Sequence, residues 1–328
     1  MSLSAFAGSC GALPTRFRRP RLLIIGCGDV GLRVQRLALA SPGAAQRGRV
    51  YALTSSPERL ALLRAAGITP LQGNLDQPRT LRRLAGLATH LLHLAPPPGQ
   101  GRDGAALLHD PRTLALVRSL RRGRLPQALV YASTSGVYGD CAGAWVPETR
   151  PVAPATARAQ RRVAAEAVLR QSLGRSGVRV SILRVPGIYA PDREGGTPRA
   201  RLLRGTAVLQ ASDDVFTNHI HADDLARACQ LALWRGAAQR IYHASDNTQL
   251  RMGDYFDGAA DLYGLPRPPR LSRREAQVQL PPLLLSFMSE SRRLENHRLR
   301  HELRLRLRYP TVAEGLRSPS GMGLMTNK

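Results

Sequence analysis

Short apolar runs alternate with amphipathic stretches along the first 190 residues of the chain. The apolar runs predict strands at residues 22–25, 49–54, 69–71, 89–94, 128–132 and 179–183. The stretches between them predict helices at residues 32–40, 57–66, 79–87, 111–121 and 155–173. Strands that alternate with helices in this way predict an α/β fold of the Rossmann type, a doubly wound parallel sheet with right-handed crossovers.

The alternation ends at about Gly187, and the rest of the chain is rich in Pro, Gly and Arg. Helices are predicted there at residues 222–234, 252–263 and around 295–304. Such a segment typically forms a smaller lobe over the carboxyl ends of the strands, where open α/β sheets bind ligands. We expect a disordered basic tail at 1–20, a Rossmann domain at 21–187, a substrate lobe at 188–316 that is partly interleaved with the core, and a flexible tail at 317–328.

A glycine-rich turn, Gly26-Cys27-Gly28-Asp29-Val30-Gly31, joins the first predicted strand to the first helix. Glycines let the backbone approach a pyrophosphate closely, and a helix N-terminus offers free N–H groups and a positive partial charge. In this context the turn predicts a dinucleotide site.

Composition agrees with a large aliphatic α/β core, since 43% of the 328 residues are hydrophobic and only 5% are aromatic. The formal charge of +25 would ordinarily suggest nucleic acid as a partner. The arginines are nevertheless spread through nearly every segment, without a basic block interleaved with aromatic residues. We interpret them mostly as a solvated surface, not as a nucleic-acid site, and expect the positive field to favour anionic ligands.

The four cysteines, Cys10, Cys27, Cys141 and Cys229, are widely separated and form no CxxC pair. They therefore indicate neither a metal site nor a disulfide framework, and they fit a reducing cytoplasm. The charges of the first twenty residues follow their weakly apolar part, which is the wrong order for a secretory signal, although an organelle transit peptide remains an alternative. Because no apolar run approaches the roughly twenty residues that cross a bilayer, we expect a soluble protein without a membrane partner.

Several phrases in order resemble one enzyme family. They are the glycine turn, Gly73-Asn74-Leu75-Asp76, residues 133–140 (STSGVYGD), residues 183–189 (LRVPGIY) and residues 219–226 (HIHADDLA). From about Arg21 to Leu316 the chain resembles the extended or atypical short-chain dehydrogenases/reductases, the NAD(P)-dependent epimerase/dehydratase family.

This resemblance implies the cofactor contacts. Gly26, Gly28, Asp29, Val30 and Gly31 would hold the pyrophosphate, Asn74 and Leu75 would flank the adenine, Leu94, Ala95 and Pro96 would lie near the ribose, and the stretch from Val185 to Tyr189 would border the nicotinamide.

The end of the second predicted strand bears on the choice of cofactor. NAD enzymes usually place Asp or Glu there against the ribose hydroxyls. Here the sequence is Thr54-Ser55-Ser56-Pro57-Glu58-Arg59, with no carboxylate at the tip. Ser55, Ser56 and Arg59 can instead hold a 2′-phosphate, which favours NADP. The alternative is NAD, and Arg59 would then be a solvated helix residue.

The resemblance also exposes a catalytic gap. The family's Ser or Thr that binds the reacting oxygen maps onto Thr134, with Ser133 and Ser135 as neighbours. The family's Tyr and Lys, four residues apart on the next helix, map onto Arg158 and Arg162. The only lysine of the whole sequence is Lys328. Arg162 can still hold ribose hydroxyls, but Arg158 cannot shuttle a proton, because arginine stays protonated. Two arginines that simply face solvent remain the alternative.

Another group must therefore act as acid or base if the protein turns over a substrate. The candidates are Tyr138, Asp140, Asp110, Glu148, His219 and His221, and one of the two histidines is expected to be structural. The 4,6-dehydratases of the family carry an Asp-Glu pair directly after the Thr. Ser135 and Gly136 stand at those positions here, which argues against elimination through such a pair.

Two functions follow as hypotheses. The first is an NAD(P)-dependent oxidoreductase or nucleotide-sugar epimerase-like enzyme that transfers hydride at nicotinamide C4 to or from an anionic substrate bound by Thr134. The second is a redox-silent NADP-binding sensor that reports cofactor occupancy to a partner. The sequence leaves the substrate and the oligomeric state open, and a homodimer is compatible with it.

Overall fold

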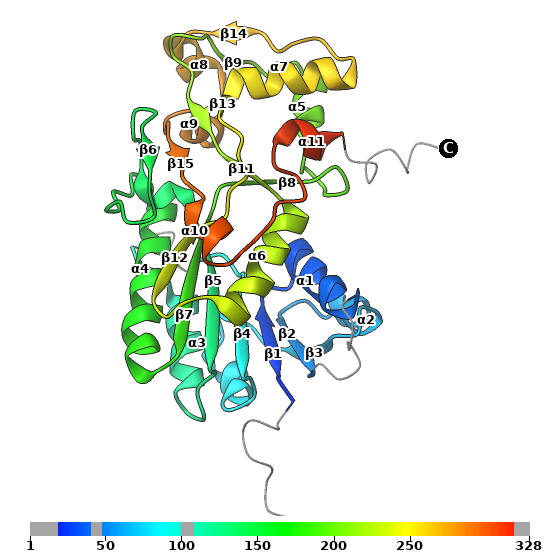
Figure 1. Cartoon of the computed structure of the whole chain (residues 1–328), viewed down its shortest axis with the longest axis vertical. Helices are drawn as coiled ribbons and strands as arrows, with labels where there is room; N and C mark the ends of the chain where they lie inside the picture. Colours follow the sequence, from blue (N-terminus) through cyan, green and yellow to red (C-terminus); the bar gives the residue numbers. More distant parts are fainter. Residues whose placement is uncertain (1–18, 41–47, 100–107, 318–328) are drawn as a thin grey trace, which may run out of the picture.

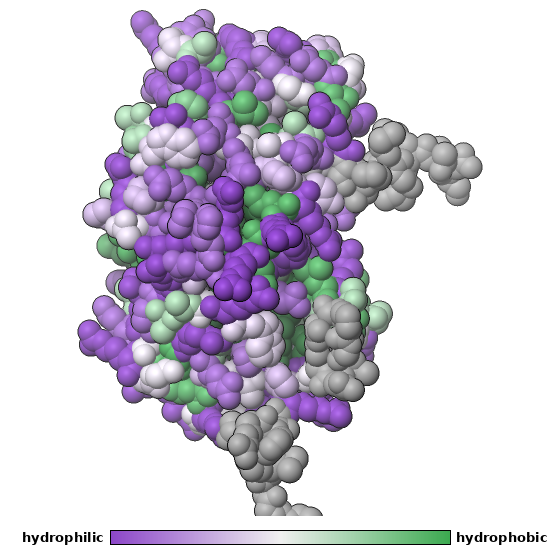
Figure 2. Space-filling view, viewed as in Figure 1, coloured by the Kyte–Doolittle hydropathy of each residue, from purple (hydrophilic) through white to green (hydrophobic). Residues whose placement is uncertain are grey.

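The computed structural model describes residues 19–40, 48–99 and 108–317, so residues 1–18 and 318–328 of the two expected tails lie outside the described part. Figure 1 shows a sheet flanked by helices in the lower part of the molecule and a smaller lobe above it. Figure 2 shows hydrophilic side chains over most of this face.

Seven parallel strands form the central sheet, which confirms the predicted Rossmann-type fold. Their spatial order is β12-β7-β5-β4-β1-β2-β3. The strands are β1 (Leu22–Ile25), β2 (Val50–Thr54), β3 (Thr69–Gln72), β4 (His90–His93), β5 (Ala128–Thr134), β7 (Arg179–Val185) and β12 (Arg240–His243). The order reverses direction next to β1, between β1 and β4, and ligands of open α/β sheets bind at such a switch point.

Helices cover both faces of the sheet. One face carries α1 (Asp29–Ala40), α2 (Arg59–Ala65) and α6 (Ala222–Arg235), and the other carries η3 (Pro78–Leu84), α3 (Pro111–Leu120) and α4 (Ala157–Ser172). Strand β1 shows why both faces must be covered, since Ile24 is buried in the first core and Leu23 and Ile25 in the second. A strand buried on both faces has a continuous apolar sequence, as LLII does here.

Two predictions for this layer were wrong in detail. Residues 78–84 form a 3₁₀ helix and not the predicted α-helix at 79–87, with Leu81 and Leu84 buried three residues apart, as a three-residue period requires. Gly86 follows with φ +67° and ends the segment. The sequence prediction also missed β12, a four-residue strand that pairs with β7. Residues after Gly187 therefore contribute both a strand and α6 to the sheet layer.

The upper lobe has its own apolar core, built around Leu202, Val208, Phe256 and Val312. Its elements are β8 (Gly187–Tyr189) paired with β11 (His219–His221), β9 (Val208–Leu209) with β14 (Arg270–Leu271), β10 (Phe216–Thr217) with β13 (Leu250–Arg251), and the helices α5 (Arg199–Leu203), α7 (Met252–Tyr263), α8 (Arg273–Gln279), α9 (Pro282–Phe287) and α11 (Val312–Leu316). Smaller elements between the lobe and the sheet are η4 (Ser135–Tyr138), β6 (Trp145–Val146), β15 (Arg293–Leu294) and α10 (His297–His301), whereas η5 (Gly174–Ser176) joins α4 to β7 within the sheet layer. The predicted helices at 222–234 and 252–263 are confirmed, whereas that around 295–304 is reduced to α10.

Candidate functional site

The glycine turn has three glycines for three different reasons. Gly26 has φ +81°, and a Cβ there would lie 2.5 Å from the backbone nitrogen of Ala95. A Cβ on Gly31 would lie 2.9 Å from Cys27 Sγ, so this glycine allows α1 to pack closely on β1. A Cβ on Gly28, in contrast, would meet no atom within 4 Å. Gly28 therefore faces open space in front of the amino end of α1, where a pyrophosphate group fits.

Asp29, at the start of α1, belongs to a group of ion pairs beside this turn. Its carboxylate contacts Arg33 at 3.0 Å and Arg193 at 3.1 Å. The buried Arg33 guanidinium also contacts Asp192 at 2.7 Å and Asp223 at 2.5 Å. The turn is thus anchored to α6 and to the segment after β8, which holds the helix N-terminus in place.

The predicted 2′-phosphate residues lie together at the carboxyl end of β2. Arg59 Nη2 donates to the backbone oxygen of Cys27 at 2.7 Å, so its guanidinium lies against the glycine turn and does not point away into solvent. Thr54 Oγ1 accepts from Ser56 N at 3.2 Å, and Ser55 is exposed. Cation and hydroxyl groups therefore border the adenosine end of the site.

The loops after β3 and β4 form the next wall. Asn74 Oδ1 accepts from Asp76 N at 2.9 Å, and Leu75 is buried behind it. Arg112 bridges the two loops, since it contacts Asp76 at 2.7 Å and donates to Pro96 O at 3.2 Å. The backbone N–H groups of Leu94 and Ala95 both donate to Ile25 O, at 2.8 and 3.1 Å, so this loop continues directly from the sheet.

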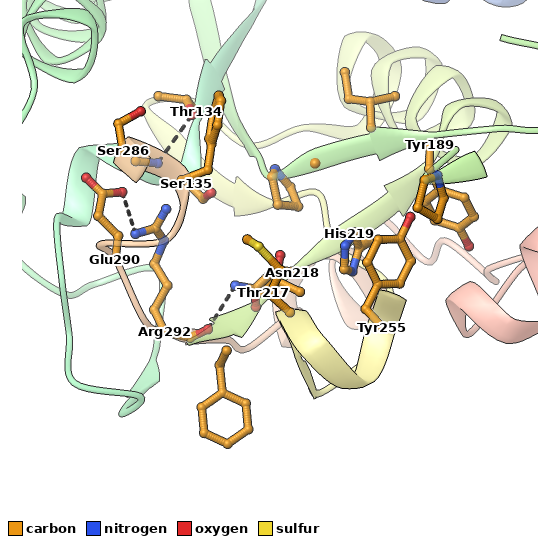
Figure 3. A pocket seen from close by; sticks show the side chains of 18 of the residues that line it. Thr134, Ser135, Tyr189, Thr217, Asn218, His219, Tyr255, Ser286, Glu290 and Arg292 are labelled. Carbon is orange, nitrogen blue, oxygen red and sulfur yellow. Dashed lines mark hydrogen bonds and ion pairs between the residues drawn. The ribbon is translucent and has the colours of Figure 1, made fainter. Parts of the chain in front are cut away.

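A cavity of about 580 Å³ opens between the end of β5, the start of α4 and the upper lobe. It brings Thr134, Arg158 and Arg162 together with the segment from Pro186 to Tyr189. Figure 3 shows Thr134 and Tyr189 on different sides of this cavity. Thr134 Oγ1 accepts from Gly136 N at 3.2 Å, which fixes the hydroxyl at the cavity wall. Val185 is buried at the end of β7, just before this segment.

The two arginines of α4 differ in their contacts. Arg162 Nη1 donates to Ala132 O at 2.6 Å and to the Tyr131 hydroxyl at 3.1 Å, so its guanidinium is fixed beneath the end of β5. The Arg158 guanidinium lies 4.9 Å from the centre of the Phe287 ring, on the side of the upper lobe. Neither side chain is a purely solvated helix residue.

Two further arginines of the upper lobe, Arg201 and Arg292, line the same cavity, together with a single carboxylate, Glu290. Arg292 Nη1 contacts Glu290 at 2.8 Å. Nε and Nη2 of Arg201 are buried and have no hydrogen-bond partner among the described residues. Its guanidinium lies 4.3 Å from the centre of the Phe256 ring, and burial lowers its pKa. Arg201 as a whole is half-buried, and a guanidinium with two N–H donors that the described residues leave unpaired makes this end of the cavity suited to an anion.

Tyr138, in contrast, does not reach the cavity. It is buried, and its hydroxyl contacts His243 Nε2 at 2.5 Å and Arg184 Nη1 at 2.7 Å. Arg184 in turn forms a buried ion pair with Glu166 at 2.8 Å, and burial lowers the pKa of His243 to about 3. Tyr138 is therefore part of a polar network behind β5, and its position gives no reason to assign it a catalytic role.

Most of the other candidate acids have structural partners. Asp110 caps α3 by accepting from Arg112 N at 3.0 Å, Asp140 accepts from Ser291 N at 2.7 Å, and His221 Nδ1 caps α6 by accepting from Asp223 N at 3.2 Å. Glu148 is buried, and burial raises its pKa.

Only His219 of this set lines the cavity, where its ring lies 4.3 Å from that of Tyr255 and burial lowers its pKa to about 4. Figure 3 shows His219 and Tyr255 across the cavity from Thr134.

Sequence reasoning missed Arg201, Glu290 and Arg292. They come from segments that carry no family phrase, and the one available signal was an acidic residue isolated in a basic stretch, Glu290 in Ser289-Glu290-Ser291-Arg292-Arg293. Cys27, Cys141 and Cys229 are free and buried. Within residues 19–40, 48–99 and 108–317, no group of His, Cys, Asp and Glu side chains is arranged to hold a metal ion, and no helix has the length and apolar character to cross a membrane.

The comparison with protein families agrees with this geometry. Residues 23–244 match the NAD dependent epimerase/dehydratase family. The chain belongs to this family. The match ends just after β12, so it includes the whole sheet, the glycine turn, Thr134 and both arginines of α4. The description of this family names NAD as the cofactor on which its members depend.

Solved structures share the fold along nearly the whole chain. A conserved protein of unknown function from Silicibacter pomeroyi is 28% identical, with a TM-score of 0.73 over 92% of this chain and 99% of that one. The dTDP-glucose 4,6-dehydratase from Streptomyces venezuelae, solved with NAD, is 22% identical, with a TM-score of 0.70 over 90% and 94%. The UDP-glucose 4-epimerase from Thermotoga maritima, solved with UDP-glucose, is 17% identical, with a TM-score of 0.70 over 90% and 96%. No curated protein matches the sequence.

Proposed function

We propose that this protein is an NADP-dependent oxidoreductase or epimerase that acts on an anionic substrate of the nucleotide-sugar type. The observation that carries this proposal is the single cavity in which Thr134 meets four arginines, Arg158, Arg162, Arg201 and Arg292, at the carboxyl edge of a dinucleotide-binding sheet.

The turn and its surroundings fit the dinucleotide. Gly28 leaves space for the pyrophosphate, and Arg59 lies beside the turn with its positive charge near the adenosine ribose. A guanidinium at this position attracts the 2′-phosphate of NADP, whereas the carboxylate that NAD enzymes carry at the strand end would repel it. We therefore prefer NADP to NAD. When bound, the nicotinamide supplies hydride acceptance or donation at C4.

The chain's own residues divide the remaining tasks. Thr134 Oγ1, fixed by Gly136 N, is placed to hydrogen-bond the reacting oxygen of the substrate. Arg162, fixed beneath β5, is placed to hold ribose hydroxyls with the N–H groups that Ala132 and Tyr131 leave free. Arg158 and Arg201 add positive charge on the substrate side, where a phosphate or carboxylate compensates it.

The substrate class rests on charge. Four arginines and one glutamate give the lining a net positive charge, and Arg201 has no partner of its own among the described residues. Structural neighbours were solved with UDP-glucose and UDP-glucuronic acid, which are anions of this kind. A neutral sugar or alcohol would leave these two N–H donors of Arg201 without an anionic partner.

Calorimetry with NAD, NADH, NADP and NADPH tests the proposal, followed by an absorbance screen of nucleotide sugars and small carbonyl compounds. We expect Gly28→Val to abolish dinucleotide binding, because the new side chain fills the space in front of α1. Gly258→Val, on the exposed face of α7 where a Cβ also meets open space, is the matched control. Unchanged affinity in Gly28→Val would remove the basis of the site.

The same experiment separates an enzyme from a redox-silent sensor. An oxidoreductase produces an absorbance change with at least one anionic substrate. An epimerase returns the hydride and leaves the absorbance unchanged, so the incubated nucleotide sugars are also analysed for a new epimer. A sensor binds the dinucleotide and gives neither result.

A further inference from the structure

Glu290 lies beside Gly136, the second residue after Thr134. The 4,6-dehydratases of the family carry a carboxylate at that position. A Cβ built on Gly136 would stand 3.6 Å from Thr134 Oγ1 and 3.7 Å from Glu290 Oε2. Both oxygens therefore border the same small space. Residue 136 carries no side chain, and a carboxylate from the segment between α9 and β15, that of Glu290, lies near its position (Figure 3).

The surroundings hold this carboxylate in place. Arg292 Nη1 donates to Glu290 Oε2 and to Gly139 O, both at 2.8 Å. The backbone oxygen of Arg292 accepts from Asn218 Nδ2 at 2.9 Å. Both charged side chains are mostly buried, with 11% of each exposed. The ion pair holds the Glu290 carboxylate in one orientation, and a group that exchanges a proton with the substrate must be held at a fixed position.

The other titratable groups of the cavity are less well placed. The Tyr189 hydroxyl donates to Thr311 O at 3.1 Å, and burial raises the pKa of Tyr255. His219 and Tyr255 lie across the cavity from Thr134 (Figure 3). Arg158, at the family's Tyr position, cannot accept a proton.

We infer that Glu290 is the catalytic acid/base of this site and replaces the absent Tyr. The inference rests on the proposed function. As a substrate alcohol bound by Thr134 is oxidised, its O–H bond breaks and the proton goes to Glu290. The hydrogen of its C–H bond would leave with both bond electrons, as a hydride that a bound oxidised nicotinamide would accept at C4, and the C=O bond would form. In the reverse direction Glu290 returns the proton to the carbonyl oxygen.

The first test is a binding measurement that needs no turnover. A carboxylate near Thr134 stabilises the positive charge of an oxidised nicotinamide but not the neutral reduced ring. We expect Glu290→Gln to weaken NADP binding by about 3- to 10-fold relative to NADPH. The control is Glu275→Gln, in the capping box of α8, because a capping box accepts glutamine as well as glutamate at this position. This change should leave the ratio unaltered. An unaltered ratio in Glu290→Gln would overturn the inference.

The second test uses whichever substrate the absorbance screen identifies. Loss of general acid/base catalysis typically costs on the order of 10²–10⁴-fold, and we expect kcat of Glu290→Gln to fall within this range while KM changes little. Glu290→Asp should retain part of the rate, and formate should rescue Glu290→Ala. Because the space at Gly136 accepts a Cβ, adding Gly136→Asp to Glu290→Ala should also restore part of the rate.

The outcomes are distinguishable. Normal turnover in Glu290→Gln would overturn the role of Glu290 and leave the proposed function intact. A lowered melting temperature without rescue by formate or by Gly136→Asp would indicate that Glu290 only anchors Arg292. Binding of dinucleotide without turnover of any substrate by the unmodified protein would overturn both the proposed function and the inference.

Discussion

Arginine occupies positions in this protein where its family usually has residues of a different chemical type. Arg158 and Arg162 stand where Tyr and Lys are expected, and Arg59 follows a strand end that lacks the carboxylate of NAD enzymes. Arginine keeps its charge at every accessible pH and offers several donors in a fixed plane. It can therefore hold hydroxyls and phosphates but cannot exchange a proton, so binding and proton transfer must be assigned to different residues here.

Arg59→Ala tests the cofactor preference at this scale. Because a hydrogen bond to a charged group contributes on the order of 1.5–3 kcal/mol, we expect NADPH binding to weaken by that amount. NADH lacks the 2′-phosphate and should bind almost as before. Calorimetry gives both values, and Arg64→Ala, an exposed position on the same helix, is the control. Equal losses for the two dinucleotides would contradict the preference for NADP.

At the scale of the element, α4 places two guanidinium groups one helical turn apart with different surroundings. Thr156 caps the helix by accepting from Ala159 N at 3.2 Å, so the first turn that carries Arg158 is firmly placed. Residues four apart lie on the same face of a helix, and here both reach the cavity. Arg162 lies beneath the strand and Arg158 against the lobe, which implies separate tasks.

Single substitutions on α4 should separate these tasks. We expect Arg162→Ala to weaken dinucleotide binding, because it removes the donors beside the ribose. Arg158→Ala should leave that affinity nearly unchanged and alter only the binding or turnover of an anionic substrate. Arg170→Ala, exposed on the same helix, controls for loss of helix stability. Dinucleotide affinity that is indifferent to Arg162→Ala would show that α4 lies away from the cofactor.

The double change Arg158→Tyr with Arg162→Lys restores the family pair. A Tyr whose pKa is lowered by a neighbouring Lys can act as a general acid. We expect this variant to keep its cofactor affinity and to carry out weak carbonyl reduction even when Glu290 is replaced by Gln. The absence of reduction in the combined variant, with cofactor still bound, would show that the cavity does not present a substrate to α4.

At the scale of the whole molecule, buried histidines couple the fold to pH. Burial lowers the pKa of His90 and His219 to about 4, and of His93 and His243 to about 3, from 6.5. Below pH 6.5 the unfolded chain binds protons that the folded protein excludes, so stability is complete above that pH and is lost as the pH falls. Buried Asp246, whose pKa burial raises to about 7, has the opposite slope over this range.

The balance predicts acid destabilisation. Each of the four histidines contributes about 1 kcal/mol over the pH unit below 6.5, and Asp246 offsets about one of the four. We therefore expect the free energy of unfolding in urea to fall by about 2 to 3 kcal/mol from pH 6.5 to pH 5.5 at constant salt. Equal stability at the two pH values would show that these side chains are hydrated in the folded protein.

The sequence by itself determined the features that depend on neighbours along the chain. The alternation of apolar runs and helices predicts the parallel sheet, and the glycine turn predicts the dinucleotide site, because both arise within a few residues. The sequence also identified the absence of the Tyr and Lys pair, since that needs only a position relative to Thr134 and a count of lysines.

The tertiary structure decided what depends on distant segments. Strand β12 is too short to be recognised alone and exists because β7 offers an edge to pair with. Tyr138 follows Thr134 closely in sequence but turns into a buried network, whereas Glu290 and Arg201 reach the cavity from the upper lobe. The physical reason is that burial and electrostatic contact depend on distance in space, which residue order does not specify once the chain leaves one strand and returns through another.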